Sequence, residues 1–581
     1  MGAFLLCRNG NKTENINRAL QVFGEKGFDE PIQFQLGDYR LFSFRKQLVP
    51  EQNTRNDDHA VLAAVGTPVY KHKSYSDTLD TAFKDLKSGH FEYAEMYGSY
   101  VLLYYDGAHI RFIFDDMGQL PIYSSCDGSV ISTSFLACAK AYDGDLTIDT
   151  MACLEKLCTG MITGTSTLFT EISRSLPESL KGIEVQAAAN KTLNPGRKGE
   201  ALGSEAQKQI SCLNEELDEI GSLVSEYGGD MGLSGGYDSR LMYGLLQNKY
   251  GDKLSVHTHC TKGAHEKEIK IAAQLADMYN KKLNICPTIP LHSMDGSEAE
   301  ETLKTNVYLF DGYSDSHYGT FSSTYSKDYR KAVSDGRLVF FTGVSGEIYR
   351  NYRKISKPVF TKGYFDTYVF YCHYQNALRN QGLAASLRQY VMDKAFQEMG
   401  KEPGAVMTPK DVRRYNACVR LPYKASCASS AFNQLCFYDA PCAHRAAIQE
   451  SMAADHVVGD DSQLEAEMIL SVDKRFGEIP VAKVDTSSIG KTDFTTSVKR
   501  FVYSRLPMST IRKRKLLNND TSIGEQIVRQ SEKIQDAVDY TKGLLEKQIS
   551  LDCLIGNRNS YQNTVFLCRT LYEFKDKICT E

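Results

Sequence analysis

Apolar and polar residues alternate in short runs over the first 190 positions, a pattern typical of β-strands. The run 97–105 is followed by an Asp-Gly dipeptide, which favours a tight turn, and then by a second apolar run at 110–114. These runs predict a hairpin, and apolar residues at helical spacing predict a helix over 76–86. We therefore expect a layered α+β sheet domain in residues 1–190.

A linker of small and polar residues, 187–206, precedes a region with a different pattern. Here short apolar runs alternate with stretches of helical periodicity. Strands are expected at 231–234, 254–258, 283–285 and 338–342, and helices at 208–227, 239–248 and 266–279. Strand–helix alternation predicts an α/β domain, a parallel sheet with helices on both faces.

The length of 581 residues exceeds what one hydrophobic core usually holds, so several domains are expected. A helical pattern continues from the parallel-sheet region to residue 505, and a charged helical tail follows it. We place the domains at 1–190, 205–505 and 506–581.

Composition narrows the class of protein. A net charge of -4 gives no basic surface for nucleic acid, and no apolar stretch approaches the roughly 18 residues that cross a membrane. The N-terminus lacks the core of a signal peptide, so we expect a cytoplasmic protein with neither nucleic acid nor membrane as partner. The sixteen cysteines include no pair at zinc-site spacing, which favours free thiols over a disulfide framework.

The sequence Ser-Gly-Gly-Tyr-Asp-Ser-Arg at 234–240 lies between a predicted strand and a predicted helix, where parallel sheets bind ligands. Gly235 and Gly236 let backbone N–H groups approach oxyanions, and Ser239 opens a helix whose N-terminus attracts phosphate. Asp238 beside phosphates requires a bridging Mg²⁺. No Gly-Lys-Ser/Thr follows, so this is not a Walker loop.

We predict from this loop that residues 233–239 bind the pyrophosphate part of ATP, with Leu233 and Ser234 at the strand end. The alternative is an incidental glycine turn, which the flanking Ser and Asp-Ser residues make much less favoured.

Three further segments carry a family resemblance. Residues 115–123, Asp-Asp-Met-Gly-Gln-Leu-Pro-Ile-Tyr, resemble a segment of the asparagine synthetase family, and residues 266–273 and 342–347 resemble its two acidic segments. The resemblance covers residues 90–500 and extends to the β-lactam synthetase and lasso-peptide cyclase relatives. It implies a class II glutamine amidotransferase-like domain of the Ntn-hydrolase type, followed by an adenine-nucleotide α-hydrolase-like (PP-loop) synthetase domain with helical additions.

The resemblance also implies roles for single residues. Glu268 and Gly343 would contact the nucleotide, and Glu347 would bind Mg²⁺ together with Asp238. The catalytic lysine that stabilises the leaving pyrophosphate is best matched by Lys483, with Lys491 as the alternative.

The chain departs from the family pattern at two positions. Gly2 stands where ammonia-producing members carry the cysteine nucleophile, and residues 65–70 lack their Asn-Gly-Glu segment. The first domain is therefore expected to lack glutaminase activity, as in β-lactam synthetase-type relatives. Val344 stands where family members carry Glu or Tyr, and valine cannot move a proton.

The resemblance implies an ATP- and Mg²⁺-dependent synthetase that adenylates a carboxylate and forms an amide or lactam, releasing AMP and pyrophosphate. Its substrates would be small-molecule or peptide carboxylates and amines, in specialised-metabolite, peptide or polysaccharide modification, and a homodimer is left open. The alternative is a nucleotide-binding pseudoenzyme that serves as a scaffold. A tRNA-modifying enzyme would need a basic surface or paired catalytic cysteines, and neither is visible.

Overall fold

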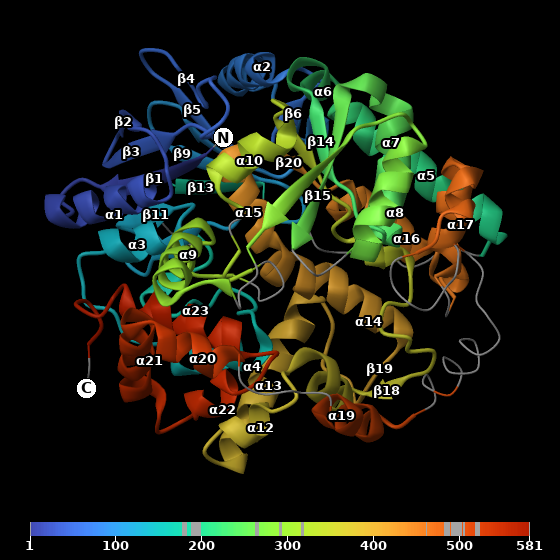
Figure 1. Ribbon diagram of the computed structural model, residues 1–581. Coiled ribbons are helices and arrows are strands. Elements are labelled where there is room, and N and C mark those ends of the chain that lie inside the picture. The colour runs from blue at the N-terminus through green and yellow to red at the C-terminus, as the bar shows by residue number, and fades with distance from the viewer. Residues whose placement is uncertain are drawn as a thin grey trace.

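A β-rich N-terminal part lies beside a central parallel sheet, and helices from the second half of the chain lie below both (Figure 1). The computed structural model describes residues 2–176, 183–187, 199–261, 266–289, 293–314, 319–322, 324–459, 462–481, 489, 502, 506–517 and 523–579.

Two sheets form the N-terminal part. The first has the order β12 (Ile172–Ser173), β10 (Tyr123–Ser125), β11 (Val130–Ser132), β1 (Ala3–Arg8), β3 (Tyr39–Phe44) and β2 (Ile32–Leu36). The second has the order β13 (Ile183–Ala187), β9 (Ile110–Phe114), β8 (Tyr100–Tyr105), β5 (Val61–Gly66) and β4 (Thr54–Asn56). The predicted hairpin is present as β8 and β9, whose Tyr105 and Ile110 are partners. One pair differs from the expected antiparallel pattern, because β13 runs parallel to β9.

The two sheets pack face to face. Alternate side chains such as Phe4 and Leu41 from the first sheet meet Leu103 and Phe112 from the second in one buried apolar cluster. Helix α1 (Thr13–Glu25) covers the outer face of the first sheet together with α3 (Phe135–Ala141), and α2 (Tyr75–Ser88) packs on the second. The predicted layered α+β organisation is therefore present, and the helix expected at 76–86 corresponds to α2.

The central sheet is entirely parallel, as predicted. Its order is β16 (Leu283–Thr288), β15 (Leu254–Thr261), β14 (Gly229–Gly232), β17 (Val339–Phe341) and β20 (Phe437–Asp439). Strand β14 is flanked by β15 and β17, so the loop that follows it opens near the middle of the sheet edge. The helices that pack on this sheet include α7 (Tyr237–Tyr250), α8 (Glu266–Asp277) and α10 (Lys327–Ser334).

Most predicted bounds differ from the observed ones by a few residues, and three predictions differ in kind. The helix expected at 208–227 is two helices, α5 (Leu202–Glu219) and α6 (Gly221–Tyr227), because Ile220 leaves helical geometry. The strand expected at 231–234 ends at Gly232, which places Leu233 and Ser234 in the loop. The stretch expected to be helical up to residue 505 also supplies β20, whose apolar residues pair with β17 at the sheet edge.

The C-terminal tail is helical, as predicted, and it packs on the rest of the molecule. Its helices are α19 (Met508–Leu517), α20 (Ile523–Gln530), α21 (Glu532–Leu545), α22 (Leu551–Ile555) and α23 (Tyr561–Tyr572). Helix α23 contacts α4 (Thr150–Thr159) and α9 (Gly296–Leu309), so the tail links both halves of the chain.

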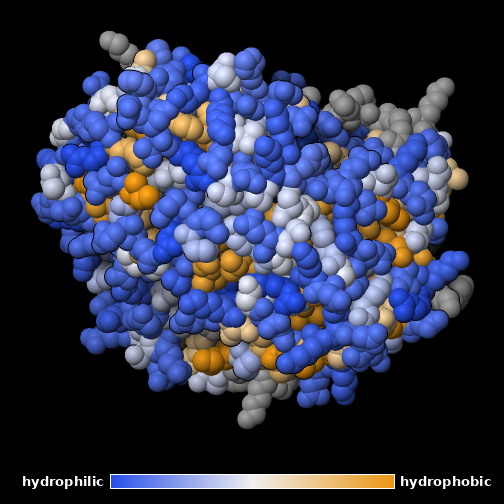
Figure 2. All heavy atoms as spheres, turned by 90° about the horizontal axis from the view of Figure 1, so that it is seen from above, coloured by the Kyte–Doolittle hydropathy of each residue, from blue (hydrophilic) through white to orange (hydrophobic). Residues whose placement is uncertain are grey.

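All sixteen cysteines are free thiols, which agrees with the expectation from their spacing. Within the described ranges, every helix is too short or too polar to cross a membrane. Figure 2 shows one face of the molecule, on which hydrophobic residues form small separate groups among hydrophilic ones.

A buried ion pair joins the N-terminal sheets to the parallel sheet. Asp439 Oδ1, at the end of β20, lies 2.7 Å from His444 Nε2, and Tyr97 Oη donates to Asp439 Oδ2 at 3.2 Å. Burial disfavours the charged imidazole, but Asp439, with the nearby Glu216 and Asp115, raises the pKa of His444 to about 9. This side chain is therefore protonated at neutral pH.

We expect the stability of the protein to fall between pH 6.5 and 9. A raised folded-state pKa supplies stability that is complete below the unfolded pKa of about 6.5 and is lost as the pH rises through the folded value. The shift corresponds to about 3 kcal/mol of the free energy of unfolding. Denaturant unfolding at pH 6.5, 7.5 and 9 measures the loss, and His444→Gln should flatten the profile. An equally steep profile in that variant would refute the assignment to His444.

Candidate functional site

The loop between β14 and α7 is closed by two serine side chains. Ser239 Oγ donates to the Ser234 carbonyl at 2.9 Å and lies 2.8 Å from Ser234 Oγ, and Gly236 N–H donates to Ser234 Oγ at 3.3 Å. Gly236 is the N-cap of α7 and provides no side-chain cap. The helix starts at Tyr237, two residues before the predicted start at Ser239, and the N–H groups of its first turn are of the kind that can bind an anion.

Arg240, the last residue of the motif, has a structural role that the sequence did not reveal. It is fully buried, and its guanidinium donates to the carbonyls of Phe476, Ile479 and Pro480 at 3.0, 2.9 and 2.8 Å. The phosphate loop is thus tied to the segment that precedes the two candidate catalytic lysines. Lys483 and Lys491 themselves lie outside the described residues.

Asp238 lies in the first turn of α7 and forms a bidentate ion pair with Arg350. The Asp238 Oδ1 and Oδ2 atoms each lie 2.8 Å from a different guanidinium nitrogen, and Arg350 Nη1 also lies 2.7 Å from Glu465 Oε2. Burial disfavours the charge on Arg350, but Glu465 and Asp238 hold the pKa of this guanidinium well above its ordinary value. The bidentate pair holds the Asp238 carboxylate in one orientation.

The loop after β17 packs directly against Asp238. A Cβ atom at Gly343 would lie 2.9 Å from the Asp238 carbonyl carbon, and one at Gly346 would overlap the Asp238 carboxylate. Both positions therefore require glycine. The 3₁₀ helix η5 (Gly346–Tyr349) follows and carries Glu347, whose Oε1 lies 3.9 Å from Arg420 Nη1. The two loops that the sequence assigned to one site are brought together.

A cavity of about 500 Å³ adjoins the phosphate loop. Its wall includes Leu233 and Ser234 from the loop after β14, Glu268 in the first turn of α8, and Val344 from the loop after β17. Aromatic side chains complete it: Tyr325, Tyr329, Phe340, Phe432 and Tyr438. Polar side chains, among them Thr258, His259 and Arg330, line it as well. Aromatic rings together with a few hydrogen-bonding groups suit the base and sugar of a nucleotide.

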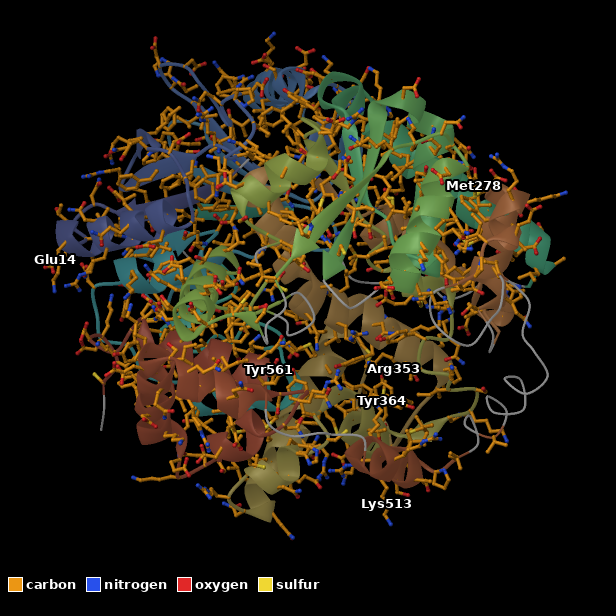
Figure 3. The ribbon with its side chains drawn as sticks, viewed as in Figure 1. Glu14, Met278, Arg353, Tyr364, Lys513 and Tyr561 are labelled. Carbon is orange, nitrogen blue, oxygen red and sulfur yellow. The ribbon has the colours of Figure 1, made fainter. Side chains whose placement is uncertain are left out.

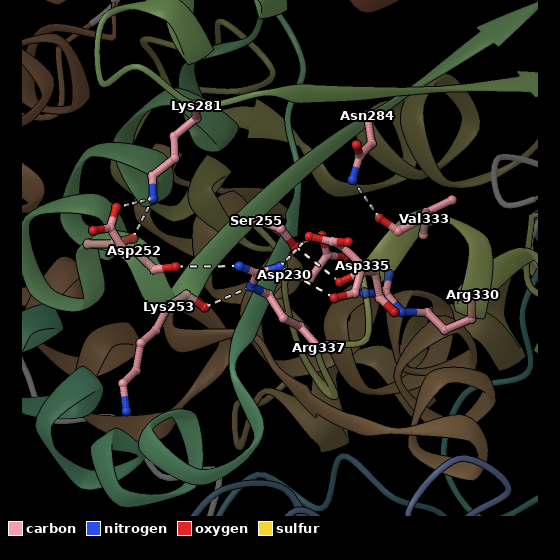
Figure 4. Close-up of polar contacts among 12 residues, drawn as sticks. Asp230, Asp252, Lys253, Ser255, Lys281, Asn284, Arg330, Val333, Asp335 and Arg337 are labelled. Carbon is pink, nitrogen blue, oxygen red and sulfur yellow. Dashed lines mark hydrogen bonds and ion pairs between the residues drawn. The ribbon is translucent and has the colours of Figure 1, made fainter.

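Two lining residues of this cavity, His257 and Arg330, belong to a buried polar network that the sequence analysis missed. Figure 4 shows Asp230, Ser255 and Arg330 of this network. Asp230 Oδ2 lies 3.0 Å from His257 Nδ1 and is ion-paired with Arg330, and Ser255 Oγ donates to Asp230 Oδ1 at 2.8 Å. Burial favours the neutral acid, but Arg330 and His257 hold the pKa of Asp230 far below its ordinary range. The one available signal was an aspartate immediately before a predicted apolar strand, which would require a partner if it were buried with that strand.

Two carboxylates offer ligands for Mg²⁺. Asp238 and Glu347 supply the hard oxygen atoms that this ion prefers, and Gly346 brings their loops into contact. Within the described part of the chain, no three His, Cys, Asp or Glu side chains form a metal site by themselves. Arg350 engages both Asp238 oxygens and Glu347 faces Arg420, so a Mg²⁺ ion would have to share these carboxylates with the arginines and take its other ligands from phosphate oxygens and water.

Gly2, where the resemblance leads us to expect no glutaminase nucleophile, lies in a crowded environment. Gly2 is buried, and a Cβ atom there would lie 2.5 Å from both the Arg45 carbonyl oxygen and a ring carbon of Phe28. The same atom would lie 2.6 Å from the Phe44 carbonyl oxygen. There is no room for a thiol without movement of the backbone.

We expect Gly2→Cys to give no ammonia release from glutamine and to lower the free energy of unfolding by about 1–3 kcal/mol through overpacking. Glutaminase assay and denaturant unfolding measure the two effects. Gly24→Cys is the matched control, because nothing lies within 4 Å of a Cβ atom at that position. Glutamine hydrolysis by the Gly2→Cys variant would contradict this prediction and show that the N-terminal domain lacks only the cysteine nucleophile.

No family model matches the chain, and no curated protein matches it. Among solved structures, it resembles the NH3-dependent NAD synthetase from Campylobacter jejuni subsp. jejuni NCTC 11168 in complex with the nitrate ion, at 15% identity and a TM-score of 0.17, over 26% of this chain and 61% of that one. It also resembles the glutamine-dependent NAD+ synthetase from Acinetobacter baumannii in complex with adenosine diphosphate, at 18% identity and a TM-score of 0.18, over 32% of this chain and 33% of that one. The chain spans less than two thirds of either protein.

Proposed function

We propose that this protein is an ATP-dependent ligase of the PP-loop type that adenylates a substrate carboxylate and transfers the acyl group to an amine. The observation that supports this most directly is the phosphate loop, whose helix N-terminus lies beside a fixed Asp238 and a nucleotide-sized cavity. The likeness to asparagine synthetases supplies the carboxylate and amine chemistry, and the Ntn-hydrolase-like assignment of the N-terminal sheets belongs to the same proposal.

In the first half-reaction, a substrate carboxylate oxygen attacks the α-phosphorus of ATP and pyrophosphate leaves. The N–H groups at the start of α7 and the Ser234 and Ser239 hydroxyls bind the pyrophosphate oxygens, where negative charge develops. Mg²⁺, when bound by Asp238 and Glu347, neutralises part of that charge. Lys483, or Lys491 in its place, would add a further cation.

In the second half-reaction, the amine nitrogen attacks the acyl carbon of the adenylate and AMP leaves. Val344 presents an apolar surface where relatives carry Glu or Tyr, so the proton of the amine passes to another acceptor, such as the departing phosphate or water. Valine at this position favours an amine that is already a strong nucleophile over ammonium derived from glutamine.

The test is formation of AMP and pyrophosphate from ATP in the presence of a panel of carboxylates, with exchange of radiolabelled pyrophosphate into ATP as the readout of adenylation. Stimulation by one class of carboxylate supports the proposal. Binding of ATP without any carboxylate-dependent exchange would instead favour the nucleotide-binding scaffold, which the substitutions at Gly2 and Val344 leave as the second candidate.

A further inference from the structure

A second cavity, of about 670 Å³, lies in the helical half of the molecule. Its wall is formed by Tyr352 and Arg353 after η5, by two π-helical segments, η6 (Phe365–Val369) and η7 (Asn416–Ala425), by α19, and by residues at the start of α23 and just before it. In Figure 3, Arg353 lies in the interior of this region, whereas Lys513 on α19 points away from it.

The charge of this cavity is strongly one-sided. Five basic side chains line it, namely Arg353, Arg420, Lys424, Lys515 and Arg558, and none of the described lining residues is Asp or Glu. Such a concentration of cations in a concave wall focuses a positive potential and attracts anions.

Aromatic rings hold two of the cations in place. The Arg353 guanidinium lies over the Tyr352 and Tyr368 rings, 4.7 and 5.0 Å from their centroids, and Lys515 Nζ lies 4.2 Å from the Tyr368 centroid. Burial, with the charge of Arg353, lowers the pKa of Lys515 to about 8. A bound anion between the two cations would relieve this repulsion.

Both π-helical segments contribute residues to the lining of the cavity. Segment η6 contributes Thr367 and Tyr368, and η7, which contains Pro422, contributes Arg420 and Lys424. A π-helical turn is a rare conformation that occurs often at functional sites. Two of them in the wall of one cavity indicate a shape that is maintained for a ligand.

The cavity is adjacent to the reacting centre along the chain. Arg350 binds Asp238, and Arg353, three residues later, lines the cavity, so their Cα atoms are at most about 11 Å apart. Arg420 pairs with Glu347 and also lines the cavity. A ligand held there can therefore present one end to the nucleotide site.

We propose that this cavity binds the substrate whose carboxylate is activated, and that this substrate is a small polyanion. It would carry at least one phosphate or carboxylate group in addition to the carboxylate that reacts. The assignment of the cavity to the substrate rests on the proposed function. The site itself uses Lys515 and Arg558, which lie beyond residues 90–500, the part of the chain that resembles a known family.

The test is binding of two probes, citrate and glycerol 3-phosphate, to the full chain without nucleotide, measured by calorimetry at low ionic strength. Citrate represents a polycarboxylate and glycerol 3-phosphate a phosphate ester, so the stronger binder identifies the second group, and glycerol is the neutral control. We expect Arg353→Gln, Lys515→Gln and Arg558→Gln each to weaken binding of that probe about tenfold, and added salt to weaken it further.

The matched control is Lys513→Gln, an exposed charge on α19 that does not line the cavity, with an expected change below about twofold. Failure of both probes to bind the unaltered protein at about 10 mM, or equal losses in the control, would overturn the proposal. ATP binding, measured separately, should be unchanged in all four variants. A protein that binds the anions but not ATP would refute the proposed function and leave the anion site standing.

Discussion

Replacing Asp238 with asparagine is expected to reduce carboxylate-dependent pyrophosphate exchange by a factor of about 100 to 1,000. The substitution keeps the shape of the side chain but removes the charge that Arg350 pairs with and that a Mg²⁺ ion would require. Losing one preorganised electrostatic contact to a developing charge costs about 3–4 kcal/mol in the transition state, which corresponds to this factor. Exchange of radiolabelled pyrophosphate into ATP measures it directly.

Asp252→Asn is the matched control for this variant. Asp252 follows α7, is exposed, and forms only a surface pair with Lys281 at 3.2 Å, so exchange should be unaffected. If Asp238→Asn retained full exchange, the carboxylate would serve only to hold Arg350, and the metal assignment would have to be abandoned. If the unaltered protein bound ATP but showed no exchange, the nucleotide-binding scaffold would describe the protein better than the ligase.

The parts of the site that are local in sequence could be predicted. The strand β14, the Gly235–Gly236 loop and helix α7 follow one another directly in the sequence. The local sequence therefore sufficed to predict a glycine loop between a strand and a helix. The loop after β17 was identified only through the family resemblance of residues 342–347, and the structure places Gly343 against Asp238. The element types of the parallel sheet also followed, since strand–helix alternation leaves few other arrangements.

The parts that depend on distant residues could not be predicted. Arg350 is 112 positions from Asp238 and 115 from Glu465, and nothing in the local pattern of either acid indicates an arginine partner. The short strand β20 resembles many apolar stretches in helices, and only its pairing with β17 makes it a strand. The cations of the second cavity are scattered between residues 353 and 558, and single basic residues are usually solvated.

Replacing Arg350 with methionine is expected to lower the free energy of unfolding by about 3–5 kcal/mol. Methionine fills much of the volume, so the loss comes from charge. Glu465 has no solvent-exposed side-chain surface, and without Arg350 it would be a buried acid beside Asp238 with no neutralising partner. Such a group must either take up a proton or draw in water, and both disfavour the folded state. Urea unfolding at pH 7 measures the change.

The double variant Arg350→Met with Glu465→Gln distinguishes charge from packing. Removing both charges should recover a large part of the lost stability, because replacing a whole buried ion pair is far less costly than breaking it. Burial already holds the pKa of Glu465 well above its ordinary value although Arg350 lowers it, so removing Arg350 should raise it further. As the pH falls, the single variant should therefore gain more stability than the unaltered protein, because folding favours the neutral acid. A double variant as unstable as the single one would show instead that Arg350 acts through its contacts with the loop after β17. If the double variant does recover its stability but loses pyrophosphate exchange, Arg350 is needed to orient Asp238 toward the nucleotide, independently of its role in stability.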